Sequence, residues 1–227
     1  MHRRSYILAL TLLTAVPFLW AGDLLDCIVA TVNGHVILLS DWQDALRYES
    51  LVARQPPAQV STSDRKAALD HLIDQELLQE QMHASDFQHA TDAEVNQRLA
   101  EIRKQYPDAA SDSAWQSLLA SYGFDTQTLK QHVVRELDVL RLVDARLRPK
   151  VSIDSVSIES YYNQQLLPQL RQSGAKEVPL AEVSPKIKEL LIQQKVNELL
   201  EAWLLNLRSG SQIQTASVPT PSQGELR

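Results

Sequence analysis

Histidines and carboxylates are the side chains of this sequence that could do acid–base or metal chemistry, and their spacing favours neither. The chain has six histidines and one cysteine. None of the histidines stands in an H-E-x-x-H motif or in a Cys/His spacing typical of zinc sites. His71 lies in a predicted helix without a thiol or a second histidine at ligand spacing. We therefore predict no metal site.

The acids and the cysteine give no better support for catalysis. Asp70, Asp74, Glu76 and Glu80 share one predicted helix, where they could do acid–base work, but such a run is typical of a solvated helix face. No G-x-S-x-G motif is present and Cys27 has no evident base, which argues against nucleophilic catalysis. Since Cys27 lies in an apolar, strand-like run, we predict a buried, inert thiol.

Cofactor binding is not indicated either. All six glycines fall at expected turns or near the chain ends, so none is left to form a phosphate-cradling loop. We predict no cofactor.

Aromatic side chains remain as candidates for binding. Their rings supply apolar contact area without demanding one partner geometry, so they could line a groove for unfolded chains. The alternative is that each ring packs in the core, which the pattern favours for Trp203. The candidate peptide-binding residues are Trp42, Tyr48, Trp115, Tyr122, Phe124, Tyr161 and Tyr162.

Composition and the first residues bear on location. The chain has 227 residues and a net charge of −6, which argues against nucleic acid and anionic membranes as partners. Residues 1–22 have the layout of a secretory signal: basic Arg3 and Arg4, then an apolar run over 7–20. An uncleaved anchor in the inner membrane is the alternative. One cysteine cannot form an internal disulfide, so the core must stabilise an exported protein alone.

The element around which the fold is organised is a long helix predicted over 179–208. Its apolar residues recur at helical spacing from Ile192 through Val196 and Trp203 to Leu207. Such a helix needs a partner for its apolar face, and only earlier segments can supply one. We therefore expect contacts between the two ends of the chain.

The segment 26–39 predicts a β-hairpin around Asn33-Gly34, the pair that best tolerates a type I′ turn. A two-stranded hairpin is marginal alone, and 211–217 is the late candidate for a third strand. Between these ends the pattern predicts helices. They run from a capping box at Ser40 to Arg54, from Asp64 to Ala84, from a capping box at Thr91 to Tyr106, from Ser113 to Tyr122, from Asp125 to Leu147 with Leu140 among its inward residues, and from Asp154 to Ser173 with a kink or end at Pro168.

The fold class is thus mostly α, with a small β-sheet formed by the N-terminal hairpin and a C-terminal strand. We expect one domain over 23–215, made of an N-terminal part (23–150) and a returning segment (151–215). Residues 216–227 are predicted to be a disordered tail.

The order of these parts resembles the SurA-type periplasmic chaperones, which are related to PpiD and more distantly to the peptide-binding region of trigger factor. Four stretches carry the resemblance: IVATVNGHVILLSDW; ALDHLIDQELLQEQ; the run TDAEVNQRLAEI, SYGFDTQTLKQHVVRELDVLRLVDARLRPKVSI and IESYYN; and PLAEVSPKIKELLIQQKVNELLEAWLLNLRSGSQIQ. Together they cover most of 26–214. The resemblance implies a helical chaperone module with the long helix packed among N-terminal helices.

The sequence departs from this family in one place. Many members carry a parvulin prolyl-isomerase domain of roughly a hundred residues after the position of Tyr161-Tyr162, and about fifteen residues there cannot form one. The resemblance thus implies a non-enzymatic, ATP-independent periplasmic holdase for unfolded exported proteins, including outer-membrane protein precursors. A structural or adaptor protein with one dedicated partner is the alternative, and a prolyl isomerase is a third hypothesis.

Overall fold

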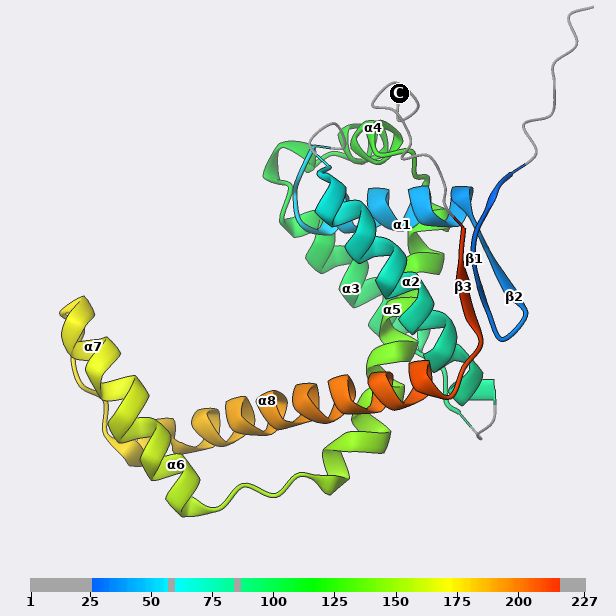
Figure 1. Ribbon diagram of the computed structural model, residues 1–227. Helices are drawn as coiled ribbons and strands as arrows, with labels where there is room; N and C mark the ends of the chain where they lie inside the picture. Colours follow the sequence, from blue (N-terminus) through cyan, green and yellow to red (C-terminus); the bar gives the residue numbers. More distant parts are fainter. Residues whose placement is uncertain (1–25, 57–59, 84–86, 217–227) are drawn as a thin grey trace, which may run out of the picture.

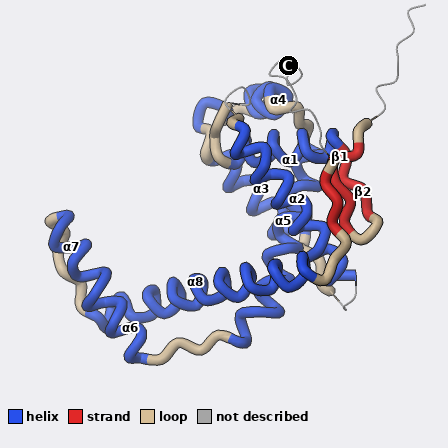
Figure 2. The backbone as a smooth tube through the Cα atoms, viewed as in Figure 1, coloured by secondary structure: helices blue, strands red, loops and turns tan. Residues whose placement is uncertain are grey.

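The computed structural model describes residues 26–56, 60–83 and 87–216. The predicted fold class is confirmed: these residues form a mostly helical body with a small three-stranded sheet at one end (Figures 1 and 2). The predicted signal at 1–22 and residues 217–227 of the tail predicted over 216–227 lie outside the described residues. Within the described ranges, no helix combines the length and apolar character that crossing a membrane requires.

The sheet joins the two ends of the chain, as predicted. β1 (Ile28–Val32) pairs antiparallel with β2 (His35–Leu38) on one side and with β3 (Ile213–Thr215) on the other. The order is therefore β2-β1-β3, with the C-terminal strand beside the N-terminal one. Asn33 and Gly34 both have positive φ, 49° and 93°, as a type I′ turn requires.

The Asn33 side chain fixes this junction. Its amide donates to Glu80 at 2.8 Å and to the Ser211 hydroxyl at 3.2 Å, and its carbonyl accepts the Gln212 amide N–H at 2.8 Å. The hairpin turn, helix α2 (Thr62–His83) and the segment before β3 are thus joined at one residue. This contact links positions that are 178 residues apart in sequence.

The remaining helices match the predicted ones closely in position. They are α1 (Leu39–Val52), α3 (Asp92–Lys104), α4 (Asp112–Ser121), α5 (Thr126–Leu147), α6 (Ser155–Tyr161), α7 (Leu167–Ser173) and α8 (Leu180–Ser209).

The predicted caps have mixed outcomes. Thr91 caps α3 in a capping box with Glu94, and Asp125 caps α5 through the Thr128 amide. The capping box at Ser40 was wrong, because the N-cap of α1 is Leu38, two residues earlier. The Leu38 amide donates to Asp41 at 3.0 Å, and the Ser40 hydroxyl is turned to Asp26 instead.

The described residues form four apolar clusters, and the two largest build the body. One lies under the sheet and contains Val29, Val32, Leu46 and Ile73, so it joins β1 to α1 and α2. The other is built by α1, α3, α4 and α5; its fully buried members include Leu51, Val95, Ile102, Leu119, Leu129 and Val133. Helix α1 contributes to both clusters and thereby connects them.

Helix α8 crosses this body and continues beyond it. Its C-terminal half packs on α5 through Val196, which is fully buried against Val143 and Leu147. Near its end Arg208 donates to the Asp74 carboxylate at 2.6 Å and to the Asp70 carbonyl at 2.9 Å on α2. The predicted packing of the last helix on N-terminal helices is therefore confirmed.

The N-terminal half of α8 forms an arm with α6 and α7, which stands away from the body (Figure 1). A π-helical turn, Tyr162–Leu166, separates α6 from α7, and Pro168 occupies the first turn of α7. Because proline has no N–H to donate, it interrupts a regular α-helical ladder. The sequence predicted a kink or an end at Pro168, and the structure has this π-helical turn between α6 and α7. Only residues 174–179 connect α7 to α8.

Two predictions about buried side chains were wrong. Leu140 is 55% exposed and belongs to none of the apolar clusters, because the face of α5 that packs on α8 carries its neighbours Val139 and Leu142 instead. Cys27 is exposed as well. It precedes β1, which begins at Ile28, and the pairing of β1 with β2 shifts register between Ile28 and Ala30, so the apolar run around Cys27 is not buried as a whole.

Candidate functional site

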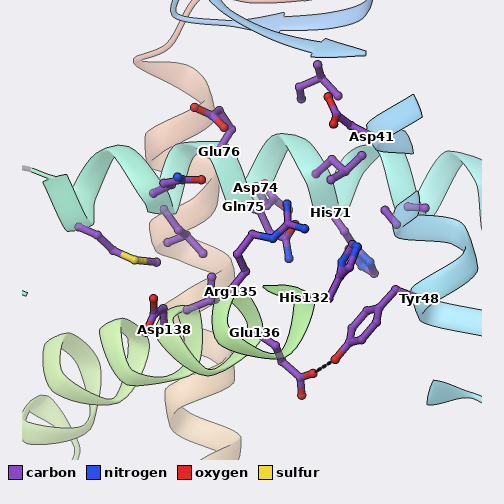
Figure 3. A pocket seen from close by; sticks show the side chains of 18 of the residues that line it. Asp41, Tyr48, His71, Asp74, Gln75, Glu76, His132, Arg135, Glu136 and Asp138 are labelled. Carbon is purple, nitrogen blue, oxygen red and sulfur yellow. Dashed lines mark hydrogen bonds between the residues drawn. The ribbon is translucent and has the colours of Figure 1, made fainter. Parts of the chain in front are cut away.

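A groove of about 920 Å³ lies between α1, α2 and α5. Helix α8 closes it from behind with Leu200 and Leu204, and β2 contributes Val36 and Ile37 at one end. Figure 3 shows the groove with α2 running across it and α5 below. Its walls therefore come from both ends of the chain, and it exists only when those ends fold together.

The lining combines apolar and ionisable side chains. Apolar groups come from α2, α5, α8, β2 and the segment after α2; among them are Val36, Leu72, Leu78, Met82, Phe87, Val139, Leu200 and Leu204. Carboxylates and histidines alternate with them along the helices. A lining of this kind can hold an extended chain by apolar contact while polar groups satisfy its backbone.

Tyr48 and His132 form the aromatic wall of the groove. Their rings stack with centroids 4.9 Å apart, and Phe124 meets the His132 ring edge-on at 5.3 Å. The Tyr48 hydroxyl donates to Glu136 (Figure 3). Glu136 also pairs with Arg98. Burial, reinforced by Glu136, raises the pKa of the Tyr48 phenol, so this ring acts as a neutral donor.

His132 gives the site a pH-dependent stability. Burial, with Arg135 nearby, lowers the pKa of His132 to about 4 from an ordinary 6.5. Between these values the unfolded chain binds more protons than the folded chain. The contribution of neutral His132 to the free energy of unfolding is therefore complete above the pKa of the unfolded chain, 6.5. It is lost as the pH falls from 6.5 towards 4.

We expect this loss to amount to about 1–2 kcal/mol, because the ring keeps some contact with solvent. His132→Phe keeps an aromatic ring against Tyr48 and removes the titration. Urea unfolding of both proteins at about pH 7 and about pH 4.5 measures the effect. The variant should lose less stability on acidification than the original chain, and equal losses would contradict the assignment.

The structure separates the seven predicted site residues. Trp42 lies in the core under the sheet, where its indole N–H donates to the Arg65 carbonyl at 2.8 Å. The core formed by α1, α3, α4 and α5 holds Trp115, Tyr122 and Phe124. These four side chains are buried, so their predicted contact with peptide has no open surface in this conformation.

The other three lie in two places. Tyr48 lines the groove. Tyr161 and Tyr162 are half-buried on the arm, at the junction of α6 and the π-helical turn, and the Tyr162 hydroxyl donates to the Val178 carbonyl at 2.7 Å. The structure therefore does not bring the seven residues together, and their role in peptide binding stays a prediction.

The acidic face of α2 is not simply solvated, which corrects the sequence interpretation. Asp70 and Asp74 bind Arg208 of α8, while Glu76 and Glu80 face His35 of the hairpin. The residue pattern of α2 alone cannot reveal these partners. Arg208 lies more than a hundred residues later in the chain, and His35 lies in the hairpin. Asp74 and Glu76 also line the groove.

Sequence reasoning missed most of the groove residues, above all those on α2 and α5. His71, Gln75 and Gln79 recur at i, i+4 and i+8 on α2, a polar stripe beside its apolar one. On α5, His132 and Val139 occur at i and i+7. Helical spacing could have identified each stripe but not that the two face each other. Among the described residues, no three histidines, cysteines or acids are grouped so as to hold a metal ion.

The comparisons with known proteins agree with this architecture. The model of the SurA-like N-terminal domain family matches residues 1–143. The chaperone SurA of Chromobacterium violaceum is 24% identical over 178 residues, which cover 77% of this chain and 39% of that relative. The chain therefore spans well under half the length of this chaperone. Because the family model matches more than half of the chain, the protein belongs to the SurA-like N-terminal domain family.

Proposed function

We propose that this protein is an ATP-independent chaperone that holds unfolded exported proteins, among them precursors of outer-membrane β-barrels, in the periplasm. The observation that carries the proposal is the groove of about 920 Å³, which is lined by apolar and polar side chains from both ends of the polypeptide. Membership in a chaperone-type family supports the same function.

The arm supplies a second surface for the same task. Val156 on α6 and Leu190 on α8 are 70% and 41% exposed. Apolar side chains exposed on the arm, away from the groove, can contact a client that is longer than the groove itself. Without a timed nucleotide cycle, such contacts must be weak and reversible, so that the client can leave.

We propose further that the protein acts without catalysis. Residues 174–179, which connect α7 to α8, have no room for an isomerase domain of roughly a hundred residues. A proline-peptide assay should therefore show the uncatalysed rate. A rate clearly above it, with contaminating isomerases excluded, would contradict this part of the proposal.

Suppression of aggregation tests the holdase function. A porin-like protein diluted from denaturant should stay soluble in the presence of the chaperone and scatter light without it. No protection at several-fold molar excess would contradict the proposal. A pull-down separates the main alternative: a spread of unfolded clients supports a holdase, whereas one stoichiometric partner would identify an adaptor.

A further inference from the structure

The rim of the groove carries many more negative than positive side chains. Seven carboxylates line it, and Arg135 is the one lysine or arginine among the lining residues. Three of the carboxylates have arginine partners just outside the groove. These pairs are Asp44 with Arg47, Asp74 with Arg208 and Glu136 with Arg98.

The other four carboxylates bind histidine rings or backbone N–H groups. Glu49 lies 2.9 Å from His71, Glu76 lies 3.1 Å from His35, and Asp138 lies 2.8 Å from His89. Asp41 accepts the Leu38 amide. A histidine supplies a full positive charge only when it is protonated, so these pairs neutralise the carboxylates less completely than arginine does.

The position of these acids matters as much as their number. Glu49 and Glu76 come from α1 and α2, and both line the groove beside apolar groups such as Leu72 and Val36. Their side chains are 39% and 25% exposed, so a ligand in the groove can reach them. At this partly desolvated rim an opposite charge on a ligand interacts more strongly than it would in bulk water.

We propose that the groove selects client segments in which Lys or Arg side chains flank apolar or aromatic ones. The apolar residues would lie on the floor, and the ammonium or guanidinium groups would reach the rim carboxylates, Glu49 and Glu76 among them. This inference rests on the proposed holdase function and adds the chemistry of its ligand. Charge complementarity between rim and segment carries it.

Fluorescent unfolded peptides of one length test the proposal. They share the same leucines and tyrosines, and lysine in the first is replaced by glutamine in the second and by glutamate in the third. The lysine peptide should bind about 3- to 10-fold more tightly than the glutamine peptide at low salt, and the glutamate peptide most weakly. Added sodium chloride should reduce the difference.

A double variant, Glu49→Gln with Glu76→Gln, assigns the effect to the rim. It should lose most of the preference for lysine, so that the ratio of its affinities for the lysine and glutamine peptides approaches one. The matched control, Glu159→Gln with Glu201→Gln, removes the same charge at exposed positions on α6 and α8 that do not line the groove, and it should keep the preference. Equal losses in the two variants would overturn the assignment.

The outcomes separate this inference from the proposed function. Equal affinity for all three peptides, together with protection of an unfolded porin, would overturn the charge preference and leave the holdase intact. Failure of all peptides to bind, together with failure to protect, would overturn both.

Discussion

Replacing Val196 with aspartate is expected to lower the free energy of unfolding by about 4 kcal/mol or more, enough to unfold much of the protein. Val196 is fully buried on α8 against Val143 and Leu147 of α5. A carboxylate there would lose its hydration without gaining a partner. Urea unfolding followed by circular dichroism measures the change.

Leu205 supplies the matched control on the same helix. It is 68% exposed, so Leu205→Asp introduces the same charge into α8 without burying it. We expect this variant to stay within about 0.5 kcal/mol of the original chain. Comparable losses in the two variants would show that α8 is not anchored on α5 through Val196.

The second large effect is expected at Asn33, where the hairpin meets the C-terminal strand. Asn33→Ala should cost about 2–3 kcal/mol, because it removes the bonds to Glu80, Ser211 and Gln212 and leaves a less suitable residue at φ 49°. Asn33→Gly loses the same bonds but adopts this φ readily, so it should cost about 1–2 kcal/mol.

The order of stability, Asn then Gly then Ala, is the test at this position. Asn and Gly both adopt this φ, so the difference between them measures mainly the side-chain bonds. Gly and Ala both lack those bonds, so the difference between them measures mainly the cost of the positive φ. Urea unfolding of the three proteins in one buffer measures it. An alanine variant at least as stable as the glycine variant would contradict the role given to the turn conformation.

Local chemistry explains which parts of the fold could be predicted. The Asn33-Gly34 turn, the caps at Thr91 and Asp125 and the interruption near Pro168 each depend on a few neighbouring residues, and the structure contains all of them. The closure by α8 followed from a different argument: a long helix with an apolar face needs a partner, and only earlier segments could supply it.

The site was harder to predict because burial depends on neighbours far away in sequence. Trp115 and Phe124 are as apolar as any groove residue, but they face α1, α3 and α5 and form core. Conversely, Asp74 and Glu76 belong to a helix face that local pattern assigns to solvent, and they border a groove. Sequence pattern identifies which face of a helix is apolar but not which element, if any, covers it.

The central claim is that unfolded clients bind in the groove between α1, α2 and α5. Photo-crosslinking from Gln75 tests it directly, since this exposed residue lines the groove, and Gln116, exposed on α4 away from the groove, serves as the control position. The account predicts that an unfolded porin crosslinks to a probe at position 75 and much less to one at position 116. Strong crosslinking at 116 with little at 75, by a protein that still prevents aggregation, would contradict it.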